Sequence, residues 1–498
     1  MARKNMWYVA LALTAFIGIL PERATATTNQ LYPLAIPYLC TANYYVDSVN
    51  GNDANLGTYL TGAWRTISHA ETTLSGKPRP GACINVAPGT YLENVSLYAG
   101  GTANTTTGYA VLRCEISADP YLYATSLGLS GSEPRCFIKG PGGEYAKGIV
   151  SFLANYEIVD GFDITSSDLT GTEAGIEGGY ATSGSTGNCP EASGACHHLA
   201  VFNSRVHSLG GAGIQMAWGA AWYVQRNEVF NTASRDVNQT SGITICCSSG
   251  KGYSGGLENT FGMQGGSYIQ NLITNNVSHN NVIGSSVTGG HTDGEGIIVD
   301  TLAETQASCS AQNAHGTLIY GNVTYGNGGE GVSVFFSSYV AVYNNTAYND
   351  FVDELNYATE RSEFLNGCGH NNTFSNNAGL AVVGAGWREY NIAGTSAAQG
   401  QSGESSILWV NNVLGTIGAP TLCYGAPFRT SVVCAWNGDT ISSSTNKYSV
   451  NPGWVGPAET LPNFLPATGS PLIGTSSATN SVTSLGGPTV TTLDIGAL

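Results

Sequence analysis

The fold is indicated by one stretch near the middle of the chain. From residue 292 to residue 349 it reads TDGEGIIVDTL, a loop, and then GTLIYGNVTYGNGGEGVSVFFSSYVAVYNNTAYN. The phrase GEGIIV at 294–299 returns as GEGVSV at 329–334. A shorter form, in which glycine precedes two alternating apolar residues, occurs at 213–216 and 242–245. A phrase that recurs in this way predicts a repeat architecture, in which one supersecondary unit stacks on the next.

A second phrase places an asparagine shortly after a hydrophobic run. It occurs at Asn203, Asn227, Asn276, Asn322 and Asn345. The first two are 24 residues apart and the last two 23, and the gaps between them, 49 and 46, are about twice as long. A coil of ~20–25 residues is typical of a parallel β-solenoid, where stacked asparagines would hydrogen-bond along the stack. The alternative, a disordered Asn- and Gly-rich segment, does not explain the hydrophobic alternation.

The amino-acid composition limits the classes of protein to which this chain can belong. The 498 residues are enough for two or three ordinary domains or for one solenoid. Lys and Arg total 18 against 34 Asp and Glu, which gives a net charge of −16. This charge argues against a nucleic-acid partner, since phosphate binding needs a basic face. It is typical of a secreted protein that binds cations or is kept soluble by its charge.

The first 26 residues have the pattern of a signal peptide. Arg3 and Lys4 precede an apolar run at 7–20, and the small residues at 24–26 form a cleavage pattern. A membrane anchor is the alternative, but the run is short for a span and no second long apolar stretch follows. We therefore expect a secreted, extracellular or periplasmic protein without membrane association after cleavage.

Twelve cysteines, an even number, are typical of an oxidising compartment. Their spacing favours local disulfides, and the adjacent Cys246 and Cys247 are expected not to pair with each other. The expected pairs are Cys114 with Cys136, Cys189 with Cys196, and Cys423 with Cys434. A zinc site is the other interpretation, but the sequence has no CxxC pair.

Several segments resemble the secreted right-handed parallel β-helix proteins of the pectate-lyase-like superfamily. At the N-terminal side these are YYVDSVNGNDANLGT (44–58), AWRTISHA (63–70) and INVAPGTYLENV (84–95). The central phrases quoted above and the segments PLIG (471–474) and DIGA (494–497) resemble the coils and the closing part of that group. The resemblance covers most of the chain and implies the fold, but this fold has many activities.

The expected organisation follows from this resemblance. Residues 1–26 are the signal peptide, 27–450 form an all-β, right-handed parallel β-helix, and 451–498 pack on its last coils. Residues 64–74 have apolar positions at helical spacing, which predicts a short helix that caps the first coil. A monomer is expected.

Candidate chemistry lies beside the repeated glycines. In each phrase the first and third residues after glycine are apolar and should face inward, so the second and fourth should face outward. This alternation places Asp300 on the outer face, just after His291, Asp293 and Glu295. Glu330 has the same place in its repeat as Glu295, so their backbones would lie ~4.8 Å apart if the coils are adjacent. Two carboxylates at such a short distance repel each other, so the pKa of one of them would be raised.

Three interpretations of these acids stay open. First, they bind Ca²⁺, a cation that prefers carboxylate oxygens; the candidate ligands are Asp236, Asp293, Glu295 and Asp300. Second, they act as general acid and base or nucleophile on a glycosidic bond. Third, they are structural and accept hydrogen bonds at turns.

Other residues complete the candidate site. Arg235 and Lys251 are candidate bases, which gives the catalytic set Asp293, Glu295, Asp300, Glu330, Arg235 and Lys251. Flat aromatic faces suit sugar rings. The candidate substrate contacts are Trp218, His291, Phe335, Tyr339 and Arg361.

The resemblance implies a secreted polysaccharide lyase that cleaves uronate-containing glycans by metal-assisted β-elimination. In such a lyase, Ca²⁺ neutralises the substrate carboxylate and a basic residue removes the proton α to it. A glycoside hydrolase that uses paired carboxylates is the first alternative. A carbohydrate-binding surface protein without catalysis is the second.

Overall fold

The computed structural model describes residues 36–102, 105–114, 136–142, 148–168, 170–179, 196–235, 240–247, 257–302, 313–356, 362–382, 390–394, 406–417, 423–424, 439–441, 446–448, 450–457, 463–468 and 470–472. The chain divides into two units, Met1–Tyr32 and Pro33–Leu498, and all described residues belong to the second. The predicted signal peptide lies outside the described residues, so it remains a prediction.

The described strands form three long parallel sheets, which we call A, B and C. Sheet A contains β1 (Ala42–Val46), β2 (Ala82–Val86), β5 (Ala110–Cys114), β8 (Glu157–Asp160), β11 (Cys196–Phe202), β14 (Gly219–Gln225), β18 (Ser267–Thr274), β21 (Gly316–Tyr320), β24 (Val340–Tyr343), β27 (Thr373–Ser375), β30 (Ile407–Val410) and β33 (Asp439–Ile441). Sheet B contains β3 (Gly89–Tyr91), β6 (Cys136–Gly140), β9 (Phe162–Ser166), β12 (Arg205–His207), β15 (Glu228–Phe230), β19 (Val277–His279), β22 (Val323–Tyr325), β25 (Thr346–Tyr348), β28 (Ala378–Val382), β31 (Val413–Ile417) and β34 (Lys447–Tyr448). Sheet C contains β4 (Val95–Leu97), β7 (Val150–Phe152), β10 (Ile176–Gly178), β13 (Ile214–Ala217), β16 (Ile243–Cys246), β20 (Ile297–Asp300), β23 (Val332–Phe335), β26 (Ser362–Gly367), β29 (Tyr390–Gly394) and β32 (Cys423–Tyr424).

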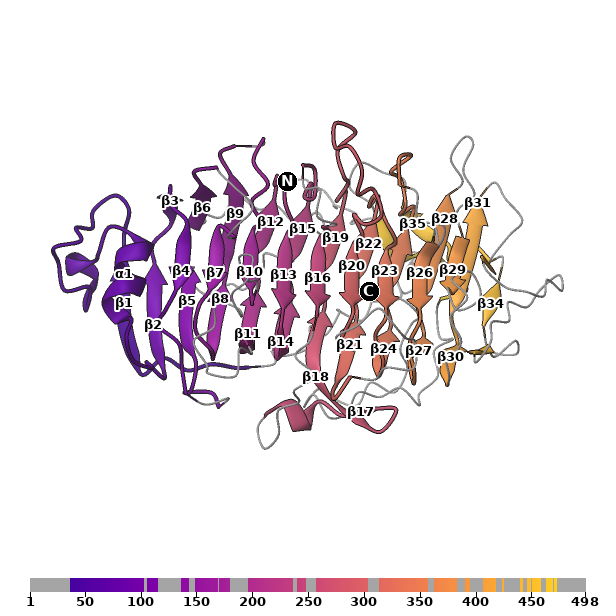
Figure 1. Cartoon of the computed structure of the whole chain (residues 1–498), viewed down its shortest axis with the longest axis horizontal. Helices are drawn as coiled ribbons and strands as arrows, with labels where there is room; N and C mark the ends of the chain where they lie inside the picture. The colour runs from indigo at the N-terminus through magenta and orange to yellow at the C-terminus, as the bar shows by residue number, and fades with distance from the viewer. Residues whose placement is uncertain are drawn as a thin grey trace, which may run out of the picture. The chain divides into compact units, whose positions relative to one another are not determined.

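From β4 onward each coil contributes one strand to every sheet, in the order C, A, B. β20, β21 and β22 form one coil, and β23, β24 and β25 form the next and pair with them in parallel. Figure 1 shows the strands of successive coils side by side. The chain is therefore a right-handed parallel β-helix, and the prediction of this fold is confirmed.

The core runs through the stack because alternate residues of every strand point inward. In β20, Ile297 and Val299 are fully buried and belong to the main hydrophobic cluster, as do Ile319 of β21 and Val342 of β24. The sequence phrases thus predicted the inward positions correctly.

A ladder of buried asparagines marks the turn between sheets A and B. Asn276 donates from its backbone and from its side-chain Nδ2 to Asn322 Oδ1, at 2.9 and 3.0 Å. Asn322 donates to Asn345 in the same way, and the pattern covers Asn227, Asn276, Asn322, Asn345, Asn377, Asn412 and Asn446. The predicted ladder is confirmed except at Asn203, because Ser204 is the residue that donates its N–H to Asn227.

The N-terminal side carries the 3₁₀ helix η1 (Leu60–Gly62) and the helix α1 (Ile67–Leu74). Thr66 caps α1 by accepting a hydrogen bond from the His69 N–H, so the helix begins inside the predicted 64–74 segment. Its apolar residues belong to the main cluster, and α1 lies at the β1 end of the stack (Figure 1). A second 3₁₀ helix, η2 (Leu257–Thr260), and the short strand β17 (Met263–Gln264) precede β18.

The described part of the C-terminal segment packs on the outer face of sheet B. β35 (Trp454–Gly456) and β36 (Asn463–Pro466) form an antiparallel pair. The Trp454 and Phe464 rings lie against Tyr348 of β25, and Trp454 shares a buried cluster with Leu380 of β28. The described residues of this segment thus lie over late coils.

Three disulfides join described cysteines: Cys40–Cys83, Cys114–Cys136 and Cys246–Cys247. The prediction for Cys114–Cys136 is confirmed, and the prediction that Cys246 and Cys247 do not pair is wrong. Cys189 and Cys434 lie outside the described residues. Within the described ranges, no helix has the length and apolar character needed to cross a membrane.

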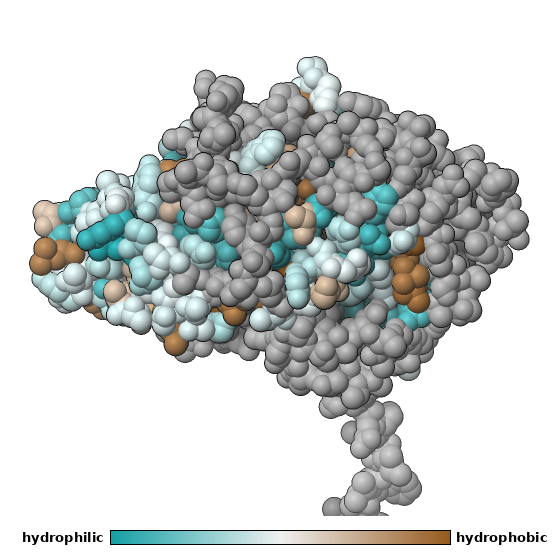
Figure 2. Space-filling view, turned by 60° about the horizontal axis from the view of Figure 1, so that its bottom comes forward, coloured by the Kyte–Doolittle hydropathy of each residue, from teal (hydrophilic) through white to brown (hydrophobic). Residues whose placement is uncertain are grey.

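The surface in Figure 2 is mostly hydrophilic or of intermediate hydropathy among the residues coloured there, and hydrophobic residues occur singly or in small groups. Large exposed apolar side chains are spread over the described chain, from Leu39 and Leu56 to Leu408. Scattered apolar residues are normal for a protein surface and need no partner.

Candidate functional site

The register of sheet C agrees with the sequence alignment of the glycine phrases. Ile214, Ile243, Ile297 and Val332 are paired on β13, β16, β20 and β23 and are buried in the core. The same ladders align the last residues of these strands, Ala217, Cys246, Asp300 and Phe335. The outer face of the sheet therefore has two rows, one at the middle of the strands and one at their carboxyl ends.

Only the row at the carboxyl ends is open to a ligand. Gln215, Thr244, Ile298 and Ser333, in the middle row, expose 8% or less of their surface. In the other row Cys246, Asp300 and Phe335 are half-buried, whereas Ala217 is fully buried. A substrate would thus meet sheet C at the corner where its strands end and the chain turns toward sheet A.

Glu295 and Glu330 lie on adjacent coils, the condition under which the sequence placed their backbones ~4.8 Å apart. The Gly296 N–H donates to the Glu330 carbonyl at 2.9 Å, and both glutamates expose only 2% of their surface. The Glu295 carboxylate accepts a hydrogen bond from Ser241 Oγ. Burial first, and then the charges of Glu330 and Asp300, raise the pKa of Glu295 well above its usual range despite the Ser241 bond. The prediction that the two acids raise a pKa is therefore supported.

Asp293 belongs to the same group of acids. It is half-buried, and its pKa is raised well above the usual range by burial and by the charges of Glu295 and Asp300. Asp300 accepts a hydrogen bond from its neighbour Thr301 Oγ1. The structure thus brings together four of the predicted acids: Asp293, Glu295, Asp300 and Glu330. We call these four residues the acid cluster.

His291 has a different role from the predicted one. It exposes 4% of its surface, and its Nδ1 and Nε2 lie 2.6 Å from Asp353 Oδ2 and 3.0 Å from the Val287 carbonyl. Burial lowers the pKa of His291, but the bonds to Asp353 and Val287 outweigh it and leave that pKa raised. Since both ring nitrogens face acceptors of the protein itself, His291 is a residue that ties two loops together and not a substrate contact.

A second contact holds the loop that bears Asp293. The Asn356 side chain donates to the carbonyls of Asp293 and Gly328, at 3.1 and 3.3 Å. Asp293 is therefore positioned by residues that follow β25, about 60 positions later in the chain. This long-range support is what a side chain needs to keep a defined place at a site.

The candidate bases are only partly described. Arg235 is exposed and donates from Nη1 to Ser286 Oγ at 2.7 Å. Lys251, Arg361 and the candidate metal ligand Asp236 lie outside the described residues. The largest charge effects on the pKa values of Asp293 and Glu295 come from other carboxylates. The described geometry therefore supplies acids to this corner, and the basic residue of the lyase hypothesis stays a prediction.

Among the aromatic candidates, Trp218 is the most accessible, with 44% of its surface exposed. Phe335 is half-buried and packs edge-to-face against Phe336, with ring centroids 4.8 Å apart. Tyr339 is half-buried and lies just before β24, on the sheet A side of the corner. Phe335 thus lies on the coil next to that of Asp300, Trp218 lies two coils away on the other side, and Tyr339 is farther along the turn.

The carboxylates suit Ca²⁺ chemically, and the predicted calcium site stays a prediction, because its candidate ligand Asp236 lies outside the described residues. No group of three or more His, Cys, Asp and Glu among them could hold a metal ion. Glu295 is buried and already accepts the Ser241 bond. We therefore derive no step through a metal.

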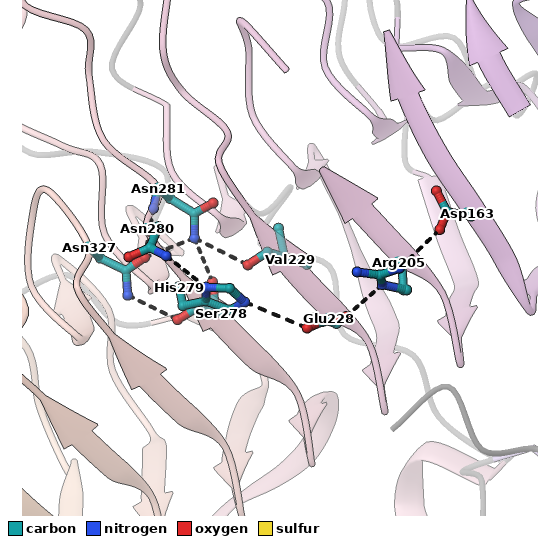
Figure 3. Close-up of polar contacts among 9 residues, drawn as sticks. All are labelled: Asp163, Arg205, Glu228, Val229, Ser278, His279, Asn280, Asn281 and Asn327. Atoms are coloured by element: carbon teal, nitrogen blue, oxygen red, sulfur yellow. Dashed lines mark hydrogen bonds and ion pairs between the residues drawn. The ribbon is translucent and has the colours of Figure 1, made fainter. Parts of the chain in front are cut away.

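A polar network that sequence reasoning missed lies on the outer face of sheet B (Figure 3). Arg205 bonds Glu228 at 2.7 Å and contacts Asp163 at 3.4 Å. His207 reaches Asp163 at 2.9 Å, and His279 lies 3.6 Å from Glu228. The aligned strand phrases RVH (205–207), EVF (228–230) and VSH (277–279) carry the signal, since five of their six outward positions are polar or aromatic and only Val277 is not.

The polar network on sheet B has a structural role. The rings of His207, Phe230, His279 and Tyr325 stack on successive coils, with centroids 4.5–5.0 Å apart and nearly parallel planes. His207 and His279 also contact the side chain that follows each of them, Ser208 and Asn280. Because both imidazoles have the same arrangement of neighbours, we interpret these contacts as structural support for the stacked rings.

Known proteins supply little beyond the fold. No protein-family model and no curated protein matches the sequence. Among solved structures, pectate lyase Pel9A is similar over 93% of this chain and 97% of its own, with 12% identity and a TM-score of 0.45. The GH136 lacto-N-biosidase from Eubacterium ramulus covers 82% of this chain and 67% of its own, with 12% identity and a TM-score of 0.41. The alginate lyase from Paenibacillus sp. str. FPU-7 covers 77% and 97%, with 14% identity and a TM-score of 0.34. Likenesses this distant do not indicate an activity.

Proposed function

We propose that the protein is a secreted, polysaccharide-active enzyme that hydrolyses glycosidic bonds at the corner where β20 ends. The observation that carries this proposal is the acid cluster. Burial and mutual repulsion raise the pKa values of Asp293 and Glu295, while Asp300 lies in the accessible row. A protonated carboxyl beside an ionised carboxylate is the pair that glycoside hydrolysis requires.

The residues take different roles because their exposure differs. Asp293 and Asp300 are half-buried and can reach a substrate, so we assign Asp293 as the general acid and Asp300 as the carboxylate that acts as nucleophile or base. Glu295 and Glu330 are buried and cannot touch a polymer. They are positioning residues, and their charge keeps a proton on the cluster at pH values where isolated carboxyls have lost theirs.

Metal-assisted β-elimination, which the resemblance implied, is the second candidate. It needs a base within hydrogen-bond reach of the proton that is removed. Of the two candidate bases, Arg235 bonds Ser286 and Lys251 lies outside the described residues. Hydrolysis needs only carboxyl groups, so the described geometry favours it. Secretion agrees with the disulfides, which persist in oxidising compartments.

A digestion panel tests the proposal. Neutral glycans, pectate and alginate are incubated with the full-length protein, with and without a chelator, and new reducing ends and unsaturated-uronate absorbance are followed together. We expect reducing ends without absorbance, unchanged by the chelator. Absorbance that the chelator abolishes would instead establish the lyase and overturn the hydrolase.

Variants then test the assigned residues. Asp300→Asn and Asp293→Asn should each lower the turnover rate by about 10²–10⁴-fold, the usual contribution of a catalytic acid or base. Asp168→Asn is the control, because Asp168 is also a half-buried aspartate in a turn but lies after β9 on sheet B. Equal rates for Asp300→Asn and Asp168→Asn, with both proteins folded, would remove Asp300 from the mechanism.

A further inference from the structure

The corner at the carboxyl ends of sheet C has the same backbone in four successive coils. Trp218, Cys247, Thr301 and Phe336 all have left-handed φ values, 57°, 56°, 51° and 42°. Each N–H donates to a carbonyl of the next coil: Trp218 to Cys247, Cys247 to Asp300, Thr301 to Phe335, and Phe336 to Gly367. The side chains of this corner therefore leave the stack in register, ~4.8 Å apart.

Two coils of this corner present surface that is apolar and uncharged. Trp218 exposes 44% of its surface, more than a core tryptophan would. On the next coil, Cys246 and Cys247 are joined as a disulfide and are half-buried. A disulfide has no charge and no S–H donor, so its sulfur atoms offer a mainly apolar contact. Trp218 and the disulfide are neighbours through the Trp218–Cys247 hydrogen bond.

This apolar surface is continuous with the acid cluster. Cys246 is the ladder partner of Asp300. A chain that lies across the coils with its reacting bond at Asp300 would place its next unit on the disulfide and the following one on Trp218. The spacing from coil to coil, ~4.8 Å, sets this sequence of contacts.

We propose that Trp218 and the Cys246–Cys247 disulfide form a subsite that binds uncharged sugar rings of the substrate, on the β13 side of Asp300. This inference rests on the proposed function of Asp300. The C–H face of a sugar ring packs well on an aromatic face and on sulfur. A uronate in this place would bring its carboxylate beside Asp300 and the acid cluster, and like charges across an interface disfavour binding. The substrate class is therefore a neutral or N-acylated glycan.

A purely structural role is the competing explanation for the disulfide. It would leave Trp218 without a function, and it predicts that loss of the disulfide changes stability but not affinity. The two explanations therefore differ in a binding measurement.

The test uses the full-length Asp300→Asn protein, in which binding is measured without cleavage. The probes are hexaoses of glucose, xylose and N-acetylglucosamine, with hexagalacturonate as the anionic comparison, and Kd is measured by calorimetry. Trp218→Gly removes the ring without backbone strain, because glycine accepts a left-handed φ. Trp218→Tyr keeps an aromatic face, and a double Cys246→Ser, Cys247→Ser variant removes the disulfide. Tyr268→Ala is the control, since Tyr268 is 49% exposed on sheet A.

We expect at least one neutral hexaose to bind more tightly than hexagalacturonate. Trp218→Gly and the double serine variant should weaken that binding by about tenfold or more, the scale of a tryptophan at the centre of an interface. Trp218→Tyr should retain most of the affinity and Tyr268→Ala all of it. The inference is overturned by equal affinity in Trp218→Gly, by tighter binding of hexagalacturonate, or by no binding of any hexaose.

A parallel cleavage assay separates this inference from the proposed function. Cleavage that depends on Asp300 but not on Trp218 would leave the enzyme in place and remove the subsite. Binding that depends on Trp218, in a wild-type protein that cleaves none of the glycans, would support the subsite and remove the catalytic assignment.

Discussion

Replacement of Asn322 by alanine should destabilise the β-helix strongly, because this side chain serves three coils at once. Its Oδ1 accepts from the backbone N–H and from the side-chain Nδ2 of Asn276. Its own Nδ2 donates to the Ile273 carbonyl and to Asn345 Oδ1, at 2.9 Å each. Asn322 is fully buried, so water does not replace these partners.

The expected cost follows from these four hydrogen bonds. A hydrogen bond contributes about 1 kcal/mol net, and a buried group left without a partner costs about 1–3 kcal/mol. The Asn276 N–H and the Ile273 carbonyl both lose a partner in Asn322→Ala. We therefore expect a loss of about 4 kcal/mol in the free energy of unfolding, well above the typical cost of one substitution.

Urea unfolding followed by circular dichroism measures this loss as a change in the midpoint and in the extrapolated free energy. The matched control is Asn231→Gly, since Asn231 is exposed and has a left-handed φ of 54°, which glycine accepts without strain. A loss below about 1 kcal/mol for Asn322→Ala, or one equal to that of Asn231→Gly, would refute the view that the ladder holds the coils together.

Three further predictions concern ionisable groups. Burial raises the pKa of Glu71 to about 7. The folded state then holds more protons than the unfolded chain, so the free energy of unfolding falls as pH rises from about 4 to 7. Between urea unfolding at pH 4 and at pH 8, the free energy of unfolding of Glu71→Gln should therefore rise by about 3 kcal/mol relative to that of wild type. His291 has a raised pKa, so its contribution to stability is complete below pH ~6.5 and is lost as pH rises through the folded pKa. In thermal scans, the difference in melting temperature between wild type and His291→Gln should therefore shrink as pH rises. Activity that uses protonated Asp293 should fall as pH rises through its raised pKa, and a rate profile whose basic limb is unchanged in Asp293→Asn would contradict this role.

The fold was predictable because its signals are local and repeated. The apolar alternation after each glycine places Ile297 and Val299 in the core, and the spacing of the asparagines gives the length of a coil. These patterns need no knowledge of which coils are neighbours. The predicted outward position of Asp300 follows from the same alternation.

The asparagine phrase also shows where such a pattern fails. In the pairs Asn275-Asn276 and Asn344-Asn345, the first residue has a left-handed φ of 55° and the second belongs to the ladder. Both places favour asparagine, one for its backbone tolerance and the other for its amide. Asn203 has the left-handed place, with a φ of 49°, and was therefore assigned to the ladder one residue too early.

The site was harder to predict than the fold because its contacts join distant segments. His291 and Asp353 are 62 residues apart, and no sequence pattern shows that they meet. The Cys246–Cys247 disulfide was missed because adjacent cysteines rarely pair, so spacing alone argued against it. Both contacts depend on loops that follow the strands and vary from coil to coil.

The repeated GEG phrase contains a glycine that the fold requires and a glutamate that it does not require. A Cβ on Gly296 would lie 2.8 Å from the Gly331 carbonyl oxygen, and one on Gly331 would lie 2.5 Å from Asp350 Oδ2, so packing requires both glycines. The residue before them is Ala212 or Ser241 in two neighbouring coils of the same register, where no carboxyl is present. The coil therefore forms without a glutamate at this place.

Two buried glutamates in adjacent coils cost stability at neutral pH, because the raised pKa of Glu295 records the penalty for its charge. The coils that carry Ala212 and Ser241 there form without a carboxyl, so the architecture does not require that cost. Features that oppose stability without a structural return are concentrated at functional sites. Glu295 and Glu330 are therefore better explained by the electrostatics they impose on Asp293 and Asp300 than by the architecture of the coil.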